Sequence, residues 1–207
     1  MAETRSISLD DVKRLRDMTG AGMMDCRKAL EDSSGDVDRA VLLLRERGIA
    51  KAAKRAGRTT SNGVVEAYLH RTSEDYPPQQ GALVELNCES DFVAKGADFR
   101  GLARELAIHI TAQAPRWVSR EDVPPDVVEQ ERELYRRRAE QEGKPAQVID
   151  KIVAGQVEAF FKESCLLDQP FVRDPAVKVG DLVAQTGAKV QENITIRRFS
   201  RFSIREG

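Results

Sequence analysis

Residues 63–70 read GVVEAYLH and residues 81–88 read GALVELNC, and these two stretches decide the fold. In both, every second residue is apolar or small over most of the stretch, which is the period of a β-strand with one face against a core. A polar segment with two adjacent prolines separates them. The pattern predicts an antiparallel hairpin.

Three short helical patterns precede this hairpin. Ser8 with Asp11 three residues later resembles a capping box at the start of the first, and Asp36 is placed to cap the third, which is expected to end at Gly48. None of the three is long enough to be stable alone, so they are expected to share one small core. Residues 1–50 are therefore predicted to form a three-helix docking module.

A basic segment, residues 51–62, follows the module and is predicted to be a hinge or a linker helix. Its cations are Lys51, Lys54, Arg55 and Arg58. They lie among alanines without interleaved aromatic residues, so a solvated face is the simpler interpretation. Contact of residues 51–58 with RNA stays open as an alternative.

The remaining residues, 63–207, predict an α+β core domain. Asp98 is expected to cap a helix that covers the sheet, and residues 125–163 predict a hairpin of two helices. The first arm of this hairpin is mostly charged, so the hairpin is expected to project.

A final strand is expected near the end of the chain. Ile194, Ile196, Phe202 and Ile204 would share one face, with Phe199 on the other. Phe199 is either half-buried under a helix or exposed as an interface residue.

Composition excludes several classes of function. Lys and Arg number 33 against 34 Asp and Glu, so no general attraction to nucleic acid or membranes is implied. No apolar stretch could span a bilayer and MAETRSISLDD lacks a signal-peptide core, so a cytoplasmic location is expected. The three cysteines, Cys26, Cys88 and Cys165, are expected to be buried and unpaired.

No catalytic constellation is visible. Neither His70 nor His109 has a cysteine or acidic residue near it at the spacing of a metal site or a catalytic triad. His109 is expected to be a hydrogen-bonded helix residue. There is no phosphate-binding glycine pattern. We therefore expect no catalytic residue, cofactor or metal.

Two segments suggest protein binding instead. Met24 lies about 100° around its helix from the face that Met23 shares with the core, which suits a docking surface but is also ordinary for a surface residue. Asp91 and Phe92 fall between a strand and a helix, at the tip of a predicted loop. Composition alone favours a Phe92 that folds back as a plug over one that stands out as a wedge.

Four motifs carry a resemblance: TGAGMMDCRKAL (19–30), NCESDFVAK (87–95), GKPAQVIDKIV (143–153) and QPFV (169–172). Together they resemble bacterial elongation factor Ts, the guanine-nucleotide exchange factor of elongation factor Tu, over essentially the full length. The resemblance implies a ubiquitin-associated-like N-terminal bundle. It places the contacts of that bundle with the GTPase at Arg16, Met23 and Met24.

The resemblance also assigns the tip residues. Asp91, Phe92 and Val93 would enter the partner near its magnesium and nucleotide site and promote GDP release. The chain is similar to the short form with one sheet subdomain, which implies a homodimer held by packing, with His70 near the GTPase. The family often has Thr where this chain has Ser90, which keeps the hydroxyl.

Two alternatives remain besides nucleotide exchange. The chain could be an adaptor that holds another protein through its three-helix module, or an RNA-binding translation accessory. An enzyme has the least support, for want of candidate groups.

Overall fold

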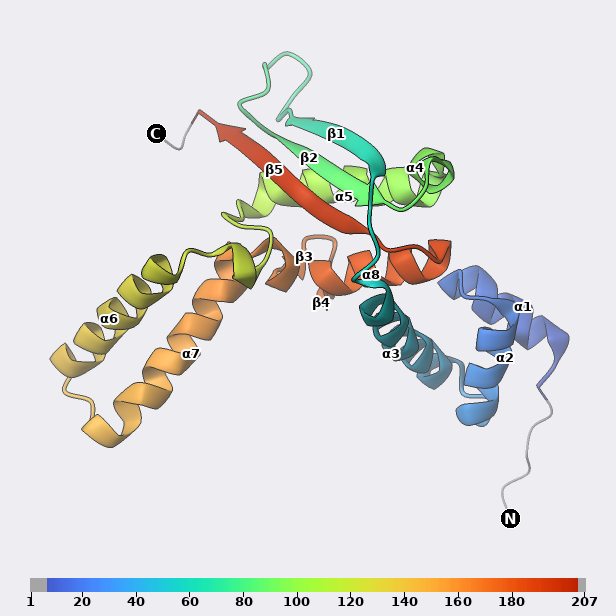
Figure 1. The fold of residues 1–207 in the computed structure, drawn as a ribbon, viewed down its shortest axis with the longest axis horizontal. Helices are drawn as coiled ribbons and strands as arrows, with labels where there is room; N and C mark the ends of the chain where they lie inside the picture. Colours follow the sequence, from blue (N-terminus) through green and yellow to red (C-terminus); the bar gives the residue numbers. More distant parts are fainter. Residues whose placement is uncertain (1–6, 205–207) are drawn as a thin grey trace. The chain divides into compact units, whose positions relative to one another are not determined.

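The structure is a computed structural model, and it describes residues 7–204. Residues 1–6, MAETRS, belong to the predicted docking module and lie outside the described part. The helices are α1 (Leu9–Thr19), α2 (Met23–Asp32), α3 (Val37–Arg55), α4 (Asp91–Lys95), α5 (Ala97–Gln113), α6 (Pro125–Gln141), α7 (Ala146–Ser164) and α8 (Val179–Val190), with 3-10 turns η1 (Arg120–Asp122) and η2 (Leu166–Asp168). The strands are β1 (Asn62–His70), β2 (Gln80–Cys88), β3 (Pro170–Phe171), β4 (Asp174–Lys178) and β5 (Thr195–Ser203) (Figure 1). The predicted α+β class is confirmed.

The chain divides into two compact units, and each is built from separate parts of the sequence. Of the described residues, the first comprises residues 7–64, Asn87–Leu102 and Val183–Thr195. The second comprises Val65–Leu86, Ala103–Leu182 and residues 196–204. The domain boundaries at residues 50 and 62 stay a prediction.

In the first unit, helices α1, α2 and α3 form a small bundle with its own core. Ser8 and Asp11 make the predicted capping box, and the Asp36 side chain accepts a hydrogen bond from the Arg39 amide. The buried core residues are Val12, Leu15, Cys26, Ala29, Leu30, Ala40 and Leu44. The end expected for the third helix at Gly48 was wrong, because α3 continues to Arg55 and takes in residues 51–55 of the basic segment.

Strands β1, β2 and β5 form one sheet in that order, with the predicted hairpin as two of its members. One face of the sheet lies against α5: Arg104 donates from Nη1 to the Glu66 carboxylate at 3.2 Å and lies 4.9 Å from the Tyr68 ring. The predicted role of Asp98 as helix cap was wrong. It lies in the first turn of α5, and its carboxylate binds Lys189 at 2.6 Å.

Burial in the sheet differs from the expected pattern. Glu66 and Tyr68 are half-buried, whereas Val65 and Leu69 are exposed. In β5 the burial phase shifts by one residue after Ile196, so Phe202 is exposed and Phe199 is half-buried, one of its two expected states. Several apolar side chains of this sheet therefore face away from α5.

Helices α6 and α7 form the predicted helical hairpin. Proline stands at its two helix starts, and Gly143 takes a left-handed φ of 69° in the turn between the arms. The two helices share a core of Ala139, Ile149, Val153 and Val157. Within residues 7–204, no helix is long and apolar enough to cross a membrane.

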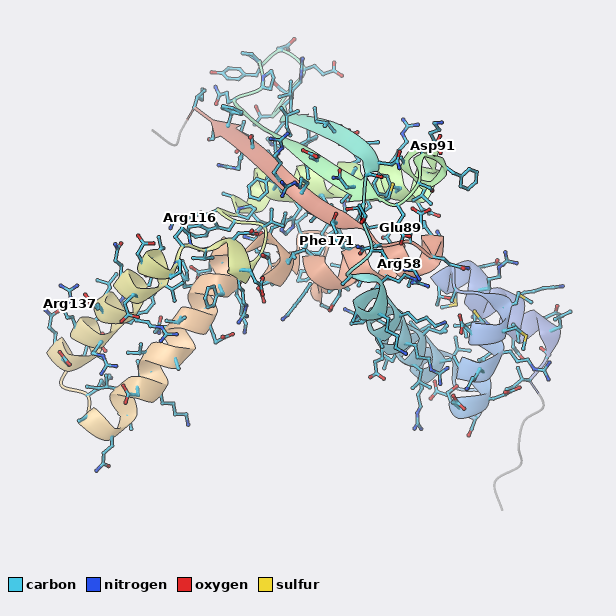
Figure 2. The ribbon with its side chains drawn as sticks, viewed as in Figure 1. Arg58, Glu89, Asp91, Arg116, Arg137 and Phe171 are labelled. Atoms are coloured by element: carbon cyan, nitrogen blue, oxygen red, sulfur yellow. The ribbon has the colours of Figure 1, made fainter. Side chains whose placement is uncertain are left out.

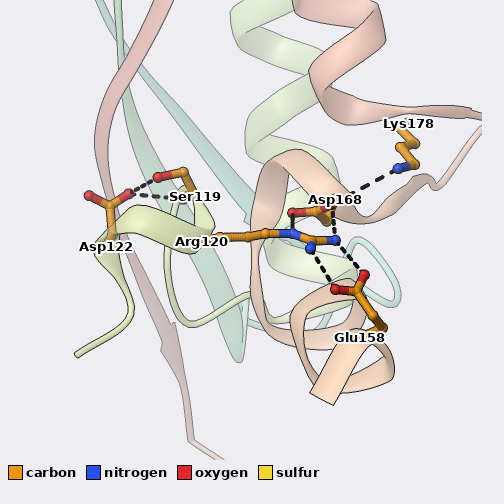
Figure 3. A network of polar contacts seen from close by, with 6 residues as sticks. All are labelled: Ser119, Arg120, Asp122, Glu158, Asp168 and Lys178. Atoms are coloured by element: carbon orange, nitrogen blue, oxygen red, sulfur yellow. Dashed lines mark hydrogen bonds and ion pairs between the residues drawn. The ribbon is translucent and has the colours of Figure 1, made fainter. Parts of the chain in front are cut away.

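The base of the hairpin is held by a charged cluster (Figure 3). Arg120 donates to both carboxylate oxygens of Glu158 on α7, at 2.9 and 3.0 Å, and to both of Asp168 in η2, at 2.9 Å. Its guanidinium also lies 4.9 Å from the Phe161 ring. The bidentate geometry ties three segments together at one point.

Strands β3 and β4 and helix α8 were not predicted. The two strands are short, with a register irregularity at Pro170 and Phe171, and such brief pairs give little periodicity to detect. Helix α8 follows directly from β4, so no loop composition marks its start.

Candidate functional site

The candidate site centres on α4, a single helical turn that the sequence suggested was a loop. Ser90 caps it: the hydroxyl accepts a hydrogen bond from the Val93 amide at 3.3 Å. This bond gives the Ser90 hydroxyl a structural role. The loop interpretation was wrong because the cap and the helix lie within six residues, too short a span to show a period.

Phe92 lies in the first turn of α4 and is 82% exposed. Val93 and Ala94, the next two residues, are buried, each with 8% of its surface exposed. The interpretation of Phe92 as a plug was therefore wrong. The turn buries Val93 and Ala94 and leaves the aromatic ring outside.

Asp91 precedes Phe92 and is also exposed (Figure 2). Its carboxylate accepts a hydrogen bond from Lys95 Nζ at 2.7 Å, one turn along the same helix. This hydrogen bond, together with the positive charge of Lys95, lowers the pKa of Asp91. The tip therefore presents an ionised carboxylate beside an apolar ring.

The N-terminal bundle presents a second candidate surface. Met24 is 75% exposed, whereas Met23 is partly buried and packs against the bundle core. Arg16 is exposed in the last turn of α1. The structure thus leaves the thioether of Met24 and the charge of Arg16 accessible in one bundle.

The basic segment is partly neutralised within its own unit. Lys51 Nζ binds the Asp25 carboxylate at 2.8 and 2.9 Å, and Arg58 Nη1 lies 3.5 Å from Glu89 Oε1 (Figure 2). Cations that already face carboxylates are less available to phosphates. This weighs against the RNA alternative.

The two histidines lie in different environments. His109 is fully buried; its Nε2 lies 2.9 Å from Gln169 Oε1 and its Nδ1 accepts from the Val172 amide at 3.1 Å. Burial lowers its pKa, so it is neutral, and the prediction of a hydrogen-bonded helix histidine is confirmed. His70 is half-buried at the end of β1, with Nδ1 3.1 Å from the Tyr68 hydroxyl. His70 is therefore partly accessible to solvent.

The three cysteines are buried and unpaired, as predicted. Burial raises the pKa of all three thiols, that of Cys165 to about 11. Thiols in this state are poor nucleophiles at neutral pH. Within residues 7–204 there is also no group of three His, Cys, Asp or Glu residues that could hold a metal ion.

Comparison with known proteins decides the family. Residues 48–206 match the family described as Elongation factor TS. A protein named elongation factor Ts from Carboxydothermus hydrogenoformans is 53% identical over 196 residues, 95% of this chain and 88% of that protein. The chain belongs to the elongation factor Ts family. Similar proteins of the same name come from Caldanaerobacter subterraneus, 51% identical over 97% of this chain and 98% of that protein, and from Herpetosiphon aurantiacus, 52% identical over 96% and 98%.

Membership in the elongation factor Ts family makes the chain a translation elongation factor. The matches to relatives cover at least 95% of the chain, so they also span the N-terminal bundle, which lies mostly before residue 48.

Sequence reasoning missed two features of this elongation factor Ts chain. One is the polar contact of Glu192 with the turn before α4, which joins residues more than 100 positions apart. The other is the exposed apolar sheet face. A signal for the second existed: β1 carries large apolar groups on both faces, Tyr68 on one and Leu69 on the other, and such strands are often covered on both sides.

Proposed function

We propose that this chain is a guanine-nucleotide exchange factor that promotes GDP release from elongation factor Tu. One observation carries the proposal: Phe92, at the tip implied by the family resemblance, is 82% exposed. A ring of this size in water has apolar surface left to bury in a partner. We infer that the partner is elongation factor Tu because the relatives are elongation factor Ts proteins.

In this mechanism Phe92 enters an apolar slot of the GTPase near its magnesium site, and the ionised Asp91 makes polar contacts at the mouth of the slot. Val93 is buried in its own subunit, so its part is to anchor the turn. Nucleotide exchange then depends on the coupling free energy between the binding of GDP and the binding of this chain to the GTPase. If this chain lowers the affinity for GDP by some ratio, GDP lowers the affinity for this chain by the same ratio.

Burial of one Phe supplies about 1.5 to 3 kcal/mol, or roughly a tenfold to hundredfold effect. Docking surfaces must supply the rest. We assign this part to the N-terminal bundle, which we propose to be ubiquitin-associated-like, through Arg16 and Met24, with Met23 supporting Met24. His70 would contact the GTPase from the sheet.

The action proposed here is binding and not covalent catalysis. His109 is fully buried, and the three thiols are buried with raised pKa values. The proposed mechanism uses no cofactor or metal of this chain.

The deciding experiment is release of fluorescently labelled GDP from elongation factor Tu in a stopped-flow instrument. Substoichiometric amounts of this chain should accelerate release and act over many turnovers. Binding to elongation factor Tu without acceleration would favour the adaptor alternative. Binding to RNA that weakens steeply with salt would favour the RNA alternative.

We also propose that the chain forms a homodimer through the sheet. Five large apolar side chains on the sheet are between 46% and 75% exposed. They are Val65, Leu69, Leu83, Phe202 and Ile204. An apolar face of this extent over three adjacent strands suits sheet-to-sheet packing with an identical face, as in a two-fold dimer.

Sedimentation velocity tests the dimer with two matched variants. Phe202→Asp places a charge on the sheet face and should shift the protein to monomer. Leu134→Asp changes another exposed apolar residue, on α6, and should leave the dimer intact. A monomeric unmodified chain at micromolar concentration would reject the dimer.

A further inference from the structure

The carboxylate of Glu192 lies against the backbone turn that leads into α4. Its Oε2 accepts hydrogen bonds from the amides of Glu89 and Ser90, each at 3.0 Å, and its Oε1 accepts from the Ser90 hydroxyl. That hydroxyl in turn accepts from the Val93 amide. A continuous chain of hydrogen bonds thus runs from Glu192 to the first turn of α4.

The end of α8 fixes where Glu192 stands. Gln191 takes a left-handed φ of 63°, and the Glu192 amide donates to the Gly187 carbonyl at 3.1 Å. This six-to-one bond is that of a Schellman motif, which ends a helix in a defined geometry. A Cβ at Gly187 would lie 2.9 Å from the Glu192 carbonyl oxygen, so the glycine permits this close turn.

The next residue, Asn193, stabilises the same turn. Its backbone N–H donates to Glu89 Oε1 at 2.6 Å, and its side-chain Nδ2 donates to the carbonyls of Ala56 and Arg58 at 3.3 and 2.9 Å. Arg58 Nη1 also lies 3.5 Å from Glu89 Oε1 (Figure 2). The end of α8 therefore holds Glu89 and Ser90 through backbone and side-chain atoms together.

We propose that Glu192 is a positioning residue for nucleotide exchange. It fixes Ser90, and through the Ser90 cap it fixes the direction in which α4 presents Phe92. The inference rests on the exchange function proposed above and adds to it a residue that need not touch the partner. Hydrogen bonds to a carboxylate are stronger than neutral ones, and a wedge misplaced by about 1 Å can lose most of its effect.

The test compares two substitutions at Glu192 in the GDP-release assay, with the concentration of the chain varied. Glu192→Ala removes every acceptor and should lower the maximal release rate about tenfold, with less than a twofold change in the half-saturating concentration. Glu192→Gln keeps one oxygen for the two amides and an NH₂ group that can donate to the Ser90 hydroxyl, so it should restore most of the rate. Glu133→Ala, an exposed carboxylate on α6, is the control and should have no effect.

A double mutant separates positioning from general loss of stability. If Glu192 acts through the ring, Glu192→Ala should slow release no further in a Phe92→Ala background. Additive losses, or a maximal rate unchanged by Glu192→Ala alone, would overturn the inference while leaving the exchange function standing. An unmodified chain without effect on GDP release would instead reject the exchange function and this role with it.

A measurement without elongation factor Tu provides an independent check. Glu192→Ala should speed hydrogen exchange at the Ser90 and Val93 amides about tenfold, with the amides of α6 unchanged. Unchanged exchange at both amides would show that Glu192 does not hold the turn, and the inference would fall.

Discussion

Replacement of Phe92 by alanine separates the stability of the chain from its proposed action. The ring is 82% exposed, so its removal leaves no cavity, and the free energy of unfolding should change by no more than about 0.5 kcal/mol. Phe99, which lies in the following helix α5, is 0% exposed. Phe99→Ala should cost about 3 to 5 kcal/mol, so two identical substitutions seven residues apart should differ strongly.

Phe92→Ala should leave stability almost unchanged but should strongly slow GDP release. Loss of a ring that is buried only in the partner removes about 1.5 to 3 kcal/mol from the exchange step, so maximal release should slow roughly tenfold to hundredfold. Binding should weaken less, because the docking surfaces remain.

Urea denaturation and stopped-flow release of labelled GDP on the same preparations provide both measurements. A Phe92→Ala chain that releases GDP at the unmodified rate would refute the wedge. A Phe92→Ala chain destabilised as much as Phe99→Ala would show that the ring packs within its own fold.

Three further outcomes are expected. Met24→Ala should raise the half-saturating concentration in the release assay about threefold to tenfold while the maximal rate is kept, because Met24 docks and does not act at the nucleotide; an unchanged half-saturation would remove Met24 from the interface. Burial holds the pKa of His109 below 6.5, so as the pH falls the unfolded chain takes up a proton before the folded chain does. The free energy of unfolding should therefore be highest above about pH 6.5 and fall below it by up to about 1.4 kcal/mol per pH unit, until the folded pKa is reached. Urea titrations from pH 5 to 8 should show this fall, and His109→Gln should reduce its slope. Arg120→Ala should lower the free energy of unfolding by about 1 to 3 kcal/mol, because the mostly buried Asp168 loses its 2.9 Å contact and keeps the longer one with Lys178 at 3.9 Å. An unchanged denaturation midpoint would contradict the role of the cluster.

Local signals predicted much of the fold. The capping box of Ser8 and Asp11, the cap at Asp36 and the proline starts of the helical hairpin are all present, because each depends on residues within one turn of one another. The strand hairpin followed from a period of two. Where the local signal was brief, as at α4 and at β3 with β4, the prediction failed.

The sequence by itself determined the family and most of the longer helices and strands, since these are encoded in motifs and in periodicity. Only the tertiary structure decided which side of each element meets solvent. Alternation assigns Val65 and Leu69 to one face of a strand but does not say which face α5 covers. The exposure of Phe92 likewise depends on which residues of α4 are buried, and these are Val93 and Ala94. The hydrogen bonds of Glu192 join residues more than 100 positions apart, and no local pattern records such contacts.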